Sequence, residues 1–294
     1  MIYISGYSGF VGSNIIKYFG EEQFVKAKKN EISISESISV IMHFAGKAHD
    51  FKNVTSSDDY YKVNFELTKK IFDAFLSSKA KVFITLSSVK AVADKVDGEL
   101  TEEVIPNPIT HYGKSKLLAE QYILSQEIPN EKQVYILRPC MIHGPGNKGN
   151  LNLLYSLVFK GLPWPLGLFE NSRSYLSIEN LCFIINELIE RVDIPSGVYN
   201  VADDIPLSTN EIINLIAESK DKKASILKIN TTIIKILARV GDFLNLPLNS
   251  ERLQKLTESY VVSNAMINSV IRKPLPVSSK DGLMRTFKSF STNV

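Results

Sequence analysis

The sequence predicts an α/β protein with a doubly wound parallel sheet and a smaller, discontinuous C-terminal lobe. Short apolar runs alternate with amphipathic stretches through the first half of the chain, as in strand–helix–strand units. The apolar runs are 2–4, 24–25, 40–43, 82–86 and 134–137, and helical patterns cover 10–19, 59–76 and 112–124. Only about 16 residues separate the second run from the third, which is tight for a full helical crossover.

The alternation breaks in the second half. Gly144-Pro145-Gly146 and Leu162-Pro163-Trp164-Pro165 interrupt it, and helical patterns dominate after Thr209. We therefore expect a sheet domain at 1–140, joined by about 175–202, and a smaller lobe formed by 141–174 and 203–294. Residues 233–243 form an apolar helical stretch that carries Lys235 and Arg239. We expect this helix to be packed, with a membrane-surface role as the alternative.

Composition excludes several function classes. The chain has 294 residues with 34 basic and 31 acidic side chains, and a net charge of +3 does not favour nucleic-acid binding. Its two cysteines and four histidines show no metal-ligand spacing, so no metal is expected. The chain opens on a strand-like run rather than a signal peptide, and no apolar run approaches the ~20 residues that span a bilayer. We expect a cytoplasmic protein without stable membrane insertion.

A glycine-rich turn follows the first predicted strand and opens the first predicted helix: Gly6-Tyr7-Ser8-Gly9-Phe10-Val11-Gly12. Such a turn lets the backbone approach a pyrophosphate, while the helix N-terminus supplies N–H donors. The sheet domain is therefore predicted to bind a dinucleotide cofactor. The cofactor-binding residues expected from this turn are Gly6, Gly9, Phe10 and Gly12.

Three further residues suggest proton-transfer chemistry. Tyr112 and Lys116 are four residues apart, so they share one face of the predicted helix, and a nearby ammonium is expected to lower the pKa of the phenol. Ser88 follows the apolar run 82–86, and ligands of parallel sheets lie beyond the carboxyl ends of the strands. We predict Ser88, Tyr112 and Lys116 as the catalytic group.

The order of these motifs resembles the extended short-chain dehydrogenases that modify nucleotide sugars, and it implies a Rossmann-like fold. The resemblance continues in His43-Phe44-Ala45-Gly46, Val63-Asn64, Arg138-Pro139, Gly149-Asn150-Leu151 and Arg173-Ser174-Tyr175. By this resemblance, Phe44, Ala45, Gly46, Asn64 and Pro139 bind the cofactor. The residues implied to bind the substrate are His49, Lys90, Asn150, Leu151, Arg173 and Arg252; for His49 a surface or capping role is the alternative.

The sequence departs from the family pattern in informative ways. The 4,6-dehydratases carry an Asp-Glu pair where this chain has Val89-Lys90, which cannot supply carboxylates for water elimination. The segment Ser87-Ser88-Val89-Lys90 resembles a subgroup that reduces the 4-keto group of UDP-2-acetamido-2,6-dideoxyhexoses in bacterial surface-polysaccharide synthesis. A UDP-sugar 4-epimerase with tightly bound NAD is the alternative. A non-catalytic, cofactor-binding regulatory protein is the alternative from another class.

The choice of cofactor is predicted from charge. NAD binders place an acidic residue about 20 residues beyond the glycine turn, to bind the ribose hydroxyls. This chain has Lys26, Lys28 and Lys29 there, with Glu31 slightly later. Lysines suit a 2′-phosphate, so NADP(H) is favoured and NAD(H) is the alternative. The family resemblance favours a homodimer through helices 59–76 and 112–124, with a monomer as the alternative.

Overall fold

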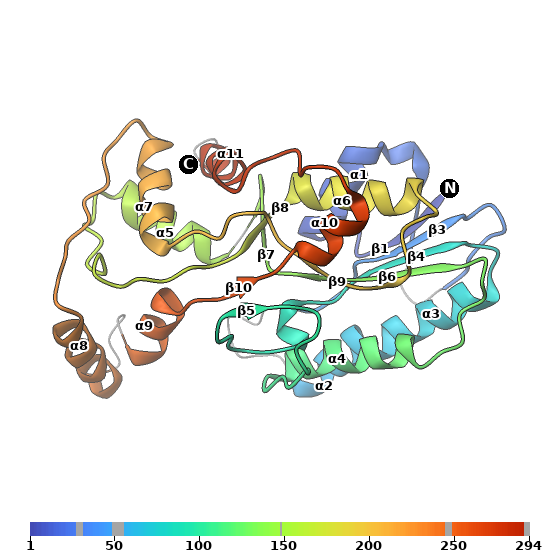
Figure 1. Cartoon of the computed structure of the whole chain (residues 1–294), viewed down its shortest axis with the longest axis horizontal. Coiled ribbons are helices and arrows are strands. Elements are labelled where there is room, and N and C mark those ends of the chain that lie inside the picture. Colours follow the sequence, from blue (N-terminus) through green and yellow to red (C-terminus); the bar gives the residue numbers. More distant parts are fainter. Residues whose placement is uncertain (28–31, 49–55, 148, 245–248, 291–294) are drawn as a thin grey trace.

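The computed structural model describes residues 1–27, 32–48, 56–147, 149–244 and 249–290. A six-stranded sheet lies at its centre, with all neighbouring strands parallel (Figure 1). Its strands, in spatial order, are β2 (Phe24–Lys26), β1 (Ile2–Ser5), β3 (Val40–His43), β4 (Val82–Leu86), β6 (Gln133–Pro139) and β9 (Gly197–Val201). The predicted fold class is confirmed.

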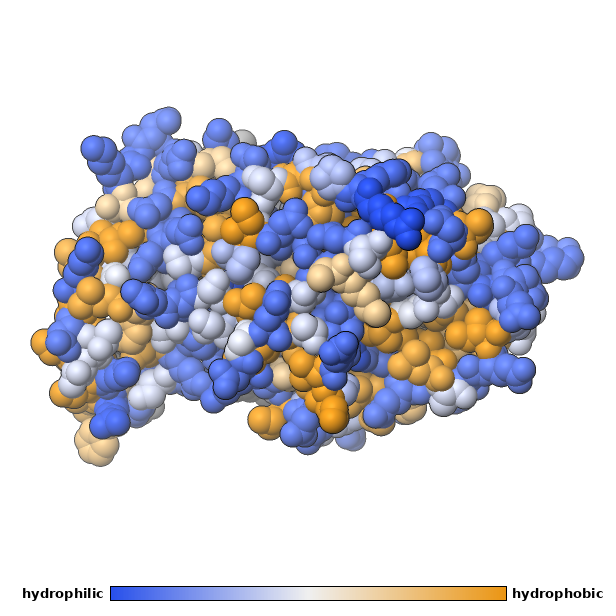
Figure 2. All heavy atoms as spheres, in the orientation of Figure 1, coloured by the Kyte–Doolittle hydropathy of each residue, from blue (hydrophilic) through white to orange (hydrophobic). Residues whose placement is uncertain are grey.

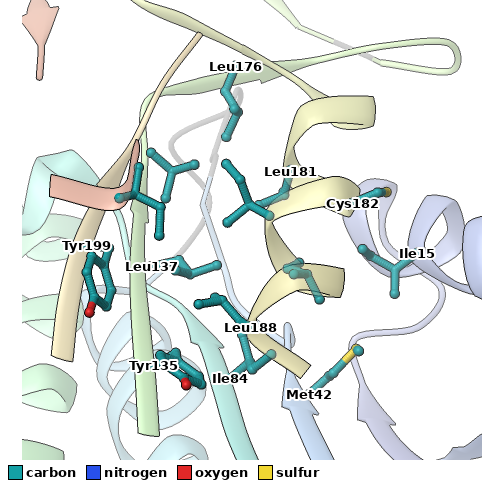
Figure 3. Packing of buried hydrophobic residues seen from close by; sticks show 14 of the residues in the cluster. Ile15, Met42, Ile84, Tyr135, Leu137, Leu176, Leu181, Cys182, Leu188 and Tyr199 are labelled. Carbon is teal, nitrogen blue, oxygen red and sulfur yellow. The ribbon is translucent and has the colours of Figure 1, made fainter. Parts of the chain in front are cut away.

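Helices cover both faces of this sheet. α1 (Phe10–Phe19) and α6 (Ile178–Glu190) lie on one face, and α3 (Leu67–Ser77) and α4 (His111–Leu124) lie on the other (Figure 1). Successive strand side chains point to opposite faces, so each strand supplies both hydrophobic cores. Ile84 packs with α6 in the core shown in Figure 3, whereas its neighbour Phe83 packs with α3 on the opposite face.

The strand order reverses next to β1. From β1 the chain passes to β2 on one side and then to β3 on the other side. In the described part of the β2–β3 connection, 32–39, there is no helix. The described residues of this connection are thus irregular. In parallel sheets, ligands bind beyond the carboxyl ends of the strands at such a reversal, which here lies at β1 and β3.

The predicted helix at 59–76 is interrupted. It consists of α2 (Ser57–Tyr61), a π-helical turn at Lys62–Glu66, and α3. A π turn inserts one extra residue into a helix and re-aims the side chains around it. Here it contains Asn64, which is fully buried.

Most of the remaining elements form the smaller lobe at the left of Figure 1 or connect it to the sheet, whereas α10 lies beside α6 and packs in the core of the sheet. β7 (Met141–His143) pairs with β8 (Tyr175–Ser177), and β5 (Glu99–Leu100) pairs with β10 (Val261–Val262). The helices are α5 (Asn150–Phe159), α7 (Thr209–Glu218), α8 (Thr231–Leu244), α9 (Ser250–Thr257), α10 (Ala265–Ile271) and α11 (Ser279–Phe290). The domain boundaries given above stay a prediction. Within the described ranges, no helix combines the length and apolarity needed to cross a membrane.

Candidate active site

The glycine turn lies against the loop after β3. Gly6 has φ 74°, and a Cβ on it would lie 2.4 Å from the backbone nitrogen of Ala45 and from the carbonyl carbon of Phe44. A Cβ on Gly12 would lie 2.3 Å from the carbonyl oxygen of Gly6. Gly9 is the N-cap of α1 and provides no side-chain cap to the helix. Side chains are excluded here and the first N–H groups of α1 have no side-chain acceptor, so this cradle fits a dinucleotide pyrophosphate.

His43 supports the cradle from below. It is buried at the end of β3, with Nδ1 2.6 Å from Ser5 Oγ and Nε2 2.8 Å from Thr68 Oγ1. Burial, together with the positive charge of Lys116, lowers the pKa of His43 to about 3. The imidazole is therefore neutral, and its hydrogen bonds connect the ends of β1 and β3 to α3.

Asn64 is committed to contacts within the protein. Its Oδ1 accepts a hydrogen bond from Lys47 N at 2.7 Å, and its Nδ2 donates to Lys47 O and to Ser115 Oγ, both at 3.0 Å. A Cβ on Gly46 would lie 3.3 Å from Asn64 Oδ1 and 3.0 Å from Lys116 Nζ. The side chain of Asn64 thus positions the loop after β3 against α4, and direct contact with a cofactor stays a prediction.

Ser88, Tyr112 and Lys116 are brought together at the carboxyl edge of the sheet. Ser88 lies two residues beyond the end of β4 and caps a 3₁₀ turn by accepting from Lys90 N at 3.2 Å. The side chain of Ser88 lies near the phenol of Tyr112 and favours its ionised form. One helical turn beyond Tyr112, Lys116 Nζ donates to the carbonyl oxygen of Leu86 at 2.8 Å.

The pKa of Tyr112 is raised, not lowered as expected, and Lys116 is not among the causes of the shift. Burial raises this pKa, and the nearby hydroxyl of Ser88 lowers it by less. Burial also lowers the pKa of Lys116 to about 8, although the negative charge of Glu120 acts to raise it. The sequence shows the helical spacing but not the burial that penalises both charged forms. Tyr112 is therefore a protonated phenol at neutral pH, which suits an acid.

Three buried residues that contact one another next to this group were not among the predicted site residues: Glu120, Ser87 and Arg138. Glu120 lies one turn beyond Lys116 and accepts hydrogen bonds from Ser87 Oγ and from the guanidinium of Arg138. Ser87 precedes Ser88, and Arg138 precedes Pro139 at the end of β6. The available signal in the sequence was a charged residue, Glu120, four residues beyond Lys116.

Two cations lie where the smaller lobe meets the segment after β4. Lys90 Nζ donates to Asp94 O at 2.8 Å and lies 4.1 Å from the ring centre of Tyr260. Burial lowers the pKa of Lys90, and the positive charge of Arg173 also lowers it. Arg173 itself donates to Lys255 O at 2.7 Å. Two partly desolvated cations that influence each other electrostatically suit a diphosphate.

The other predicted site residues lie in different parts of the structure. Lys26 ends β2 and pairs with Glu21 on the surface at 2.5 Å, and Pro139 is buried at the end of β6. The Leu151 side chain is 2% exposed and packs in the core of the smaller lobe. Arg252 lies in the first turn of α9. Lys28, His49 and the side chain of Asn150 lie outside the described residues.

Among the described residues, no group of three or more His, Cys, Asp or Glu side chains could hold a metal ion. The candidate site therefore consists of a glycine cradle, a serine–tyrosine–lysine group and a cationic border. All three lie beyond the carboxyl ends of the strands or at the junction with the smaller lobe.

Comparisons with known proteins agree with this geometry. The UDP-glucose 4-epimerase of Vibrio cholerae is 27% identical, over 98% of this chain and 95% of its own length. The N-acetyl-alpha-D-glucosaminyl-diphospho-ditrans,octacis-undecaprenol 4-epimerase of Escherichia coli O157:H7 is 25% identical, over 76% of this chain and 73% of its own length. The fold is shared with UDP-glucuronic acid 4-epimerase from Bacillus cereus in complex with NAD, at TM-score 0.74 and 17% identity over 99% and 98% of the two chains.

A family model begins at the strand before the glycine turn and continues past the end of β9, matching residues 2–202. It spans both the cradle and the serine–tyrosine–lysine group. The resemblance in the motifs is confirmed at this level: the chain belongs to the NAD dependent epimerase/dehydratase family.

Proposed function

We propose that this protein is a nicotinamide-dependent enzyme that acts at C4 of a nucleotide sugar. The reaction that we favour is reduction of a 4-keto UDP-2-acetamido-2,6-dideoxyhexose in bacterial surface-polysaccharide synthesis. The observation that carries the proposal is that the side chains of Ser88 and Tyr112 lie near each other, with Lys116 one helical turn from Tyr112. This arrangement can hold a carbonyl oxygen and deliver a proton to it.

The proposed roles follow from the protonation states. Tyr112 is protonated at neutral pH because burial raises its pKa, so it can donate its proton to O4 as that oxygen gains charge. Ser88 donates a hydrogen bond to the same oxygen once its contact with Tyr112 is shared with the substrate. Lys116 is buried beneath them and holds the ribose of the bound cofactor. The nicotinamide, when bound, supplies or accepts the hydride.

The second candidate is 4-epimerisation. Two relatives named above, from Vibrio cholerae and Escherichia coli, are 4-epimerases, and this reaction needs the same three side chains. In an epimerase Tyr112 would take the proton from O4 and later return it. The hydride that the cofactor accepts from C4 would be returned to the other face of the sugar, so no cofactor would be consumed overall. A regulatory protein without catalysis is the weaker alternative, because nothing in such a role requires Ser88, Tyr112 and Lys116 to be kept together.

The substrate is proposed to be held through its anionic diphosphate. Lys90 and Arg173 form the cationic border and are proposed to hold the diphosphate. Arg252, Asn150, Leu151 and His49 stay predicted substrate-binding residues. One relative takes a sugar that is linked through diphosphate to undecaprenol rather than to a nucleoside. The diphosphate is common to both kinds of donor, so these two cations would serve either.

The proposed preference for NADP(H) depends on Lys26 in the described part of the chain. Lys26 is the last residue of β2 and lies next to the cradle. Its side chain is 41% exposed. We expect Lys26→Ala to weaken NADPH binding and to leave NADH binding unchanged, since only NADPH carries the 2′-phosphate. Fluorescence titration with each cofactor measures this. Equal weakening for both cofactors would exclude a phosphate-specific role.

The function is tested by mixing the purified protein with UDP-2-acetamido-2,6-dideoxy-4-hexulose and following the absorbance of NADPH, with NADH in parallel. Stoichiometric consumption, faster with NADPH, is expected for the reductase. No consumption, with NAD bound to the protein as isolated and UDP-sugars interconverted at C4, would replace reduction by epimerisation. Cofactor binding without any turnover or nucleotide-sugar binding would favour the regulatory protein.

A further inference from the structure

α8 presents an apolar face to solvent. Six of its apolar side chains have exposed fractions that range from 45% for Val240 to 87% for Phe243. All six recur at spacings of three and four residues, so they form one stripe along the helix. The exposed apolar face consists of Ile233, Ile236, Leu237, Val240, Phe243 and Leu244.

The opposite side of α8 already packs against the protein. Ile234 and Ala238 are buried in the core of the smaller lobe, and Gly241 is also buried. The packed and exposed apolar residues lie on different sides of the helix. The exposed face is therefore not needed to attach α8 to the lobe. The helix expected at 233–243 is packed through one side only.

Positive charge borders this face. Lys235 and Arg239 are exposed and occupy one edge of the stripe. Asp242 is the acidic residue of the helix, and its carboxylate accepts from Ser250 N at 2.8 Å and from Ser250 Oγ at 2.5 Å. It is thus used to hold α9. Over 220–239 the chain has six lysine or arginine residues and one aspartate, whereas its total net charge is +3.

The position of α8 leaves the face accessible. The helix lies at the end of the molecule farthest from the sheet, at the lower left of Figure 1. Hydrophobic residues are interspersed with hydrophilic ones over this end of the surface in Figure 2. Its 14 residues span about 21 Å, too short to cross a bilayer but long enough to lie along one.

We propose that α8 docks on the surface of an anionic lipid bilayer. The apolar face enters the boundary between headgroups and acyl chains, and Lys235 and Arg239 contact the lipid phosphates. A second copy of the chain fits this face less well. A two-fold contact through α8 would place the same cationic edge of both copies in one interface, where the charges repel.

Vesicle co-sedimentation of the full-length protein tests the proposal. We expect binding to vesicles of phosphatidylcholine with roughly one-third phosphatidylglycerol, and weak binding to phosphatidylcholine alone, because the cations need an anionic surface. Raised salt should weaken the binding. Phe243→Glu should lower the partition coefficient at least about tenfold, since it puts a charge in the apolar face. Val192→Glu is the matched control, because Val192 is 86% exposed but lies outside α8.

A second pair of variants separates charge from apolar contact. Lys235→Glu with Arg239→Glu should abolish the preference for anionic vesicles while circular dichroism shows an intact fold. Equal sedimentation of the wild type and Phe243→Glu would overturn the proposal. So would a dimer, measured by light scattering without lipid, that Phe243→Glu converts to a monomer while vesicle binding is absent. Each readout is independent of enzyme turnover, so failure of the proposed reaction would not affect it.

Discussion

Arg138 and Glu120 form a buried ion pair directly below the candidate active site. The guanidinium donates from Nη2 to Oε2 at 2.6 Å and from Nε to Oε1 and Oε2 at 3.0 and 3.2 Å. The side chains are 6% and 2% exposed. Ser87 donates to the same carboxylate. The pair therefore connects the ends of β4 and β6 to α4, the helix that carries Tyr112 and Lys116.

Removing one member of this pair should destabilise the protein strongly. We expect Glu120→Ala to lower the free energy of unfolding by about 3–5 kcal/mol, because it leaves the buried charge of Arg138 unpaired. Replacing both residues together, as Glu120→Met with Arg138→Met, should recover much of that loss, since no uncompensated charge remains. Urea unfolding of the three proteins measures both effects. A double variant as unstable as Glu120→Ala would show that packing, not charge, accounts for the loss.

The glycine turn should not tolerate a side chain at Gly6. A Cβ there meets the backbone of the 44–46 loop at 2.4 Å, in addition to the strain of φ 74°. Gly98→Ala is the control, because Gly98 has φ 81° and nothing within 4 Å of its Cβ position. We expect Gly98→Ala to cost about 1–3 kcal/mol of stability from backbone strain alone. Gly6→Ala should cost more and should also abolish cofactor binding in a fluorescence titration, whereas Gly98→Ala should bind normally.

Features that depend on neighbouring residues in the chain were predictable from the sequence. The strand–glycine–helix unit at the N-terminus is contiguous, and the four-residue spacing of Tyr112 and Lys116 fixes their shared helix face. The interruption of the helix at Lys62–Glu66 was not visible, because a single inserted residue scarcely changes an apolar pattern. The two-residue strands β5 and β10 are likewise too short to produce a periodic signal.

Features that depend on contacts between distant segments were not predictable. Glu120 meets Arg138 only because β6 lies beside β4 in the sheet and α4 covers them. The ring of Tyr260 reaches Lys90 from the far end of the chain. Burial also explains why the pKa of Tyr112 is raised rather than lowered, since the sequence alone does not show how far a helix face is removed from water.

The phenol of Tyr112 should be required for turnover but not for cofactor binding. We expect Tyr112→Phe to lower kcat by ~10²–10⁴-fold, because the proton donor to O4 is lost while the ring and its packing remain. Tyr122→Phe is the matched control on the same helix: its hydroxyl contacts Asp73 and Lys69, away from Ser88. Steady-state kinetics and cofactor titration separate the two effects. Near-normal turnover of Tyr112→Phe would exclude Tyr112 as the acid.

The buried ammonium of Lys116 should make stability depend on alkaline pH. Its pKa in the folded protein is about 8, below the ordinary 10.5, because burial disfavours the charged form. Below pH 8 the folded state therefore carries the full penalty of the buried charge. Between pH 8 and 10.5 the unfolded chain binds the extra proton, so the contribution of Lys116 to stability rises with pH, by at most ~3 kcal/mol.

Lys116→Met removes this titration and is the reference protein. The free energy of unfolding of the wild type, relative to Lys116→Met, should therefore increase between pH 8 and 10.5 and stay level from pH 6 to 7.5. Denaturant unfolding at a series of pH values measures the difference, in which the titration of all other groups largely cancels. A difference that falls as pH rises would mean that Lys116 is stabilised as a cation in the folded protein. In that case the hydrogen bond to Leu86 O, rather than burial, would dominate its protonation.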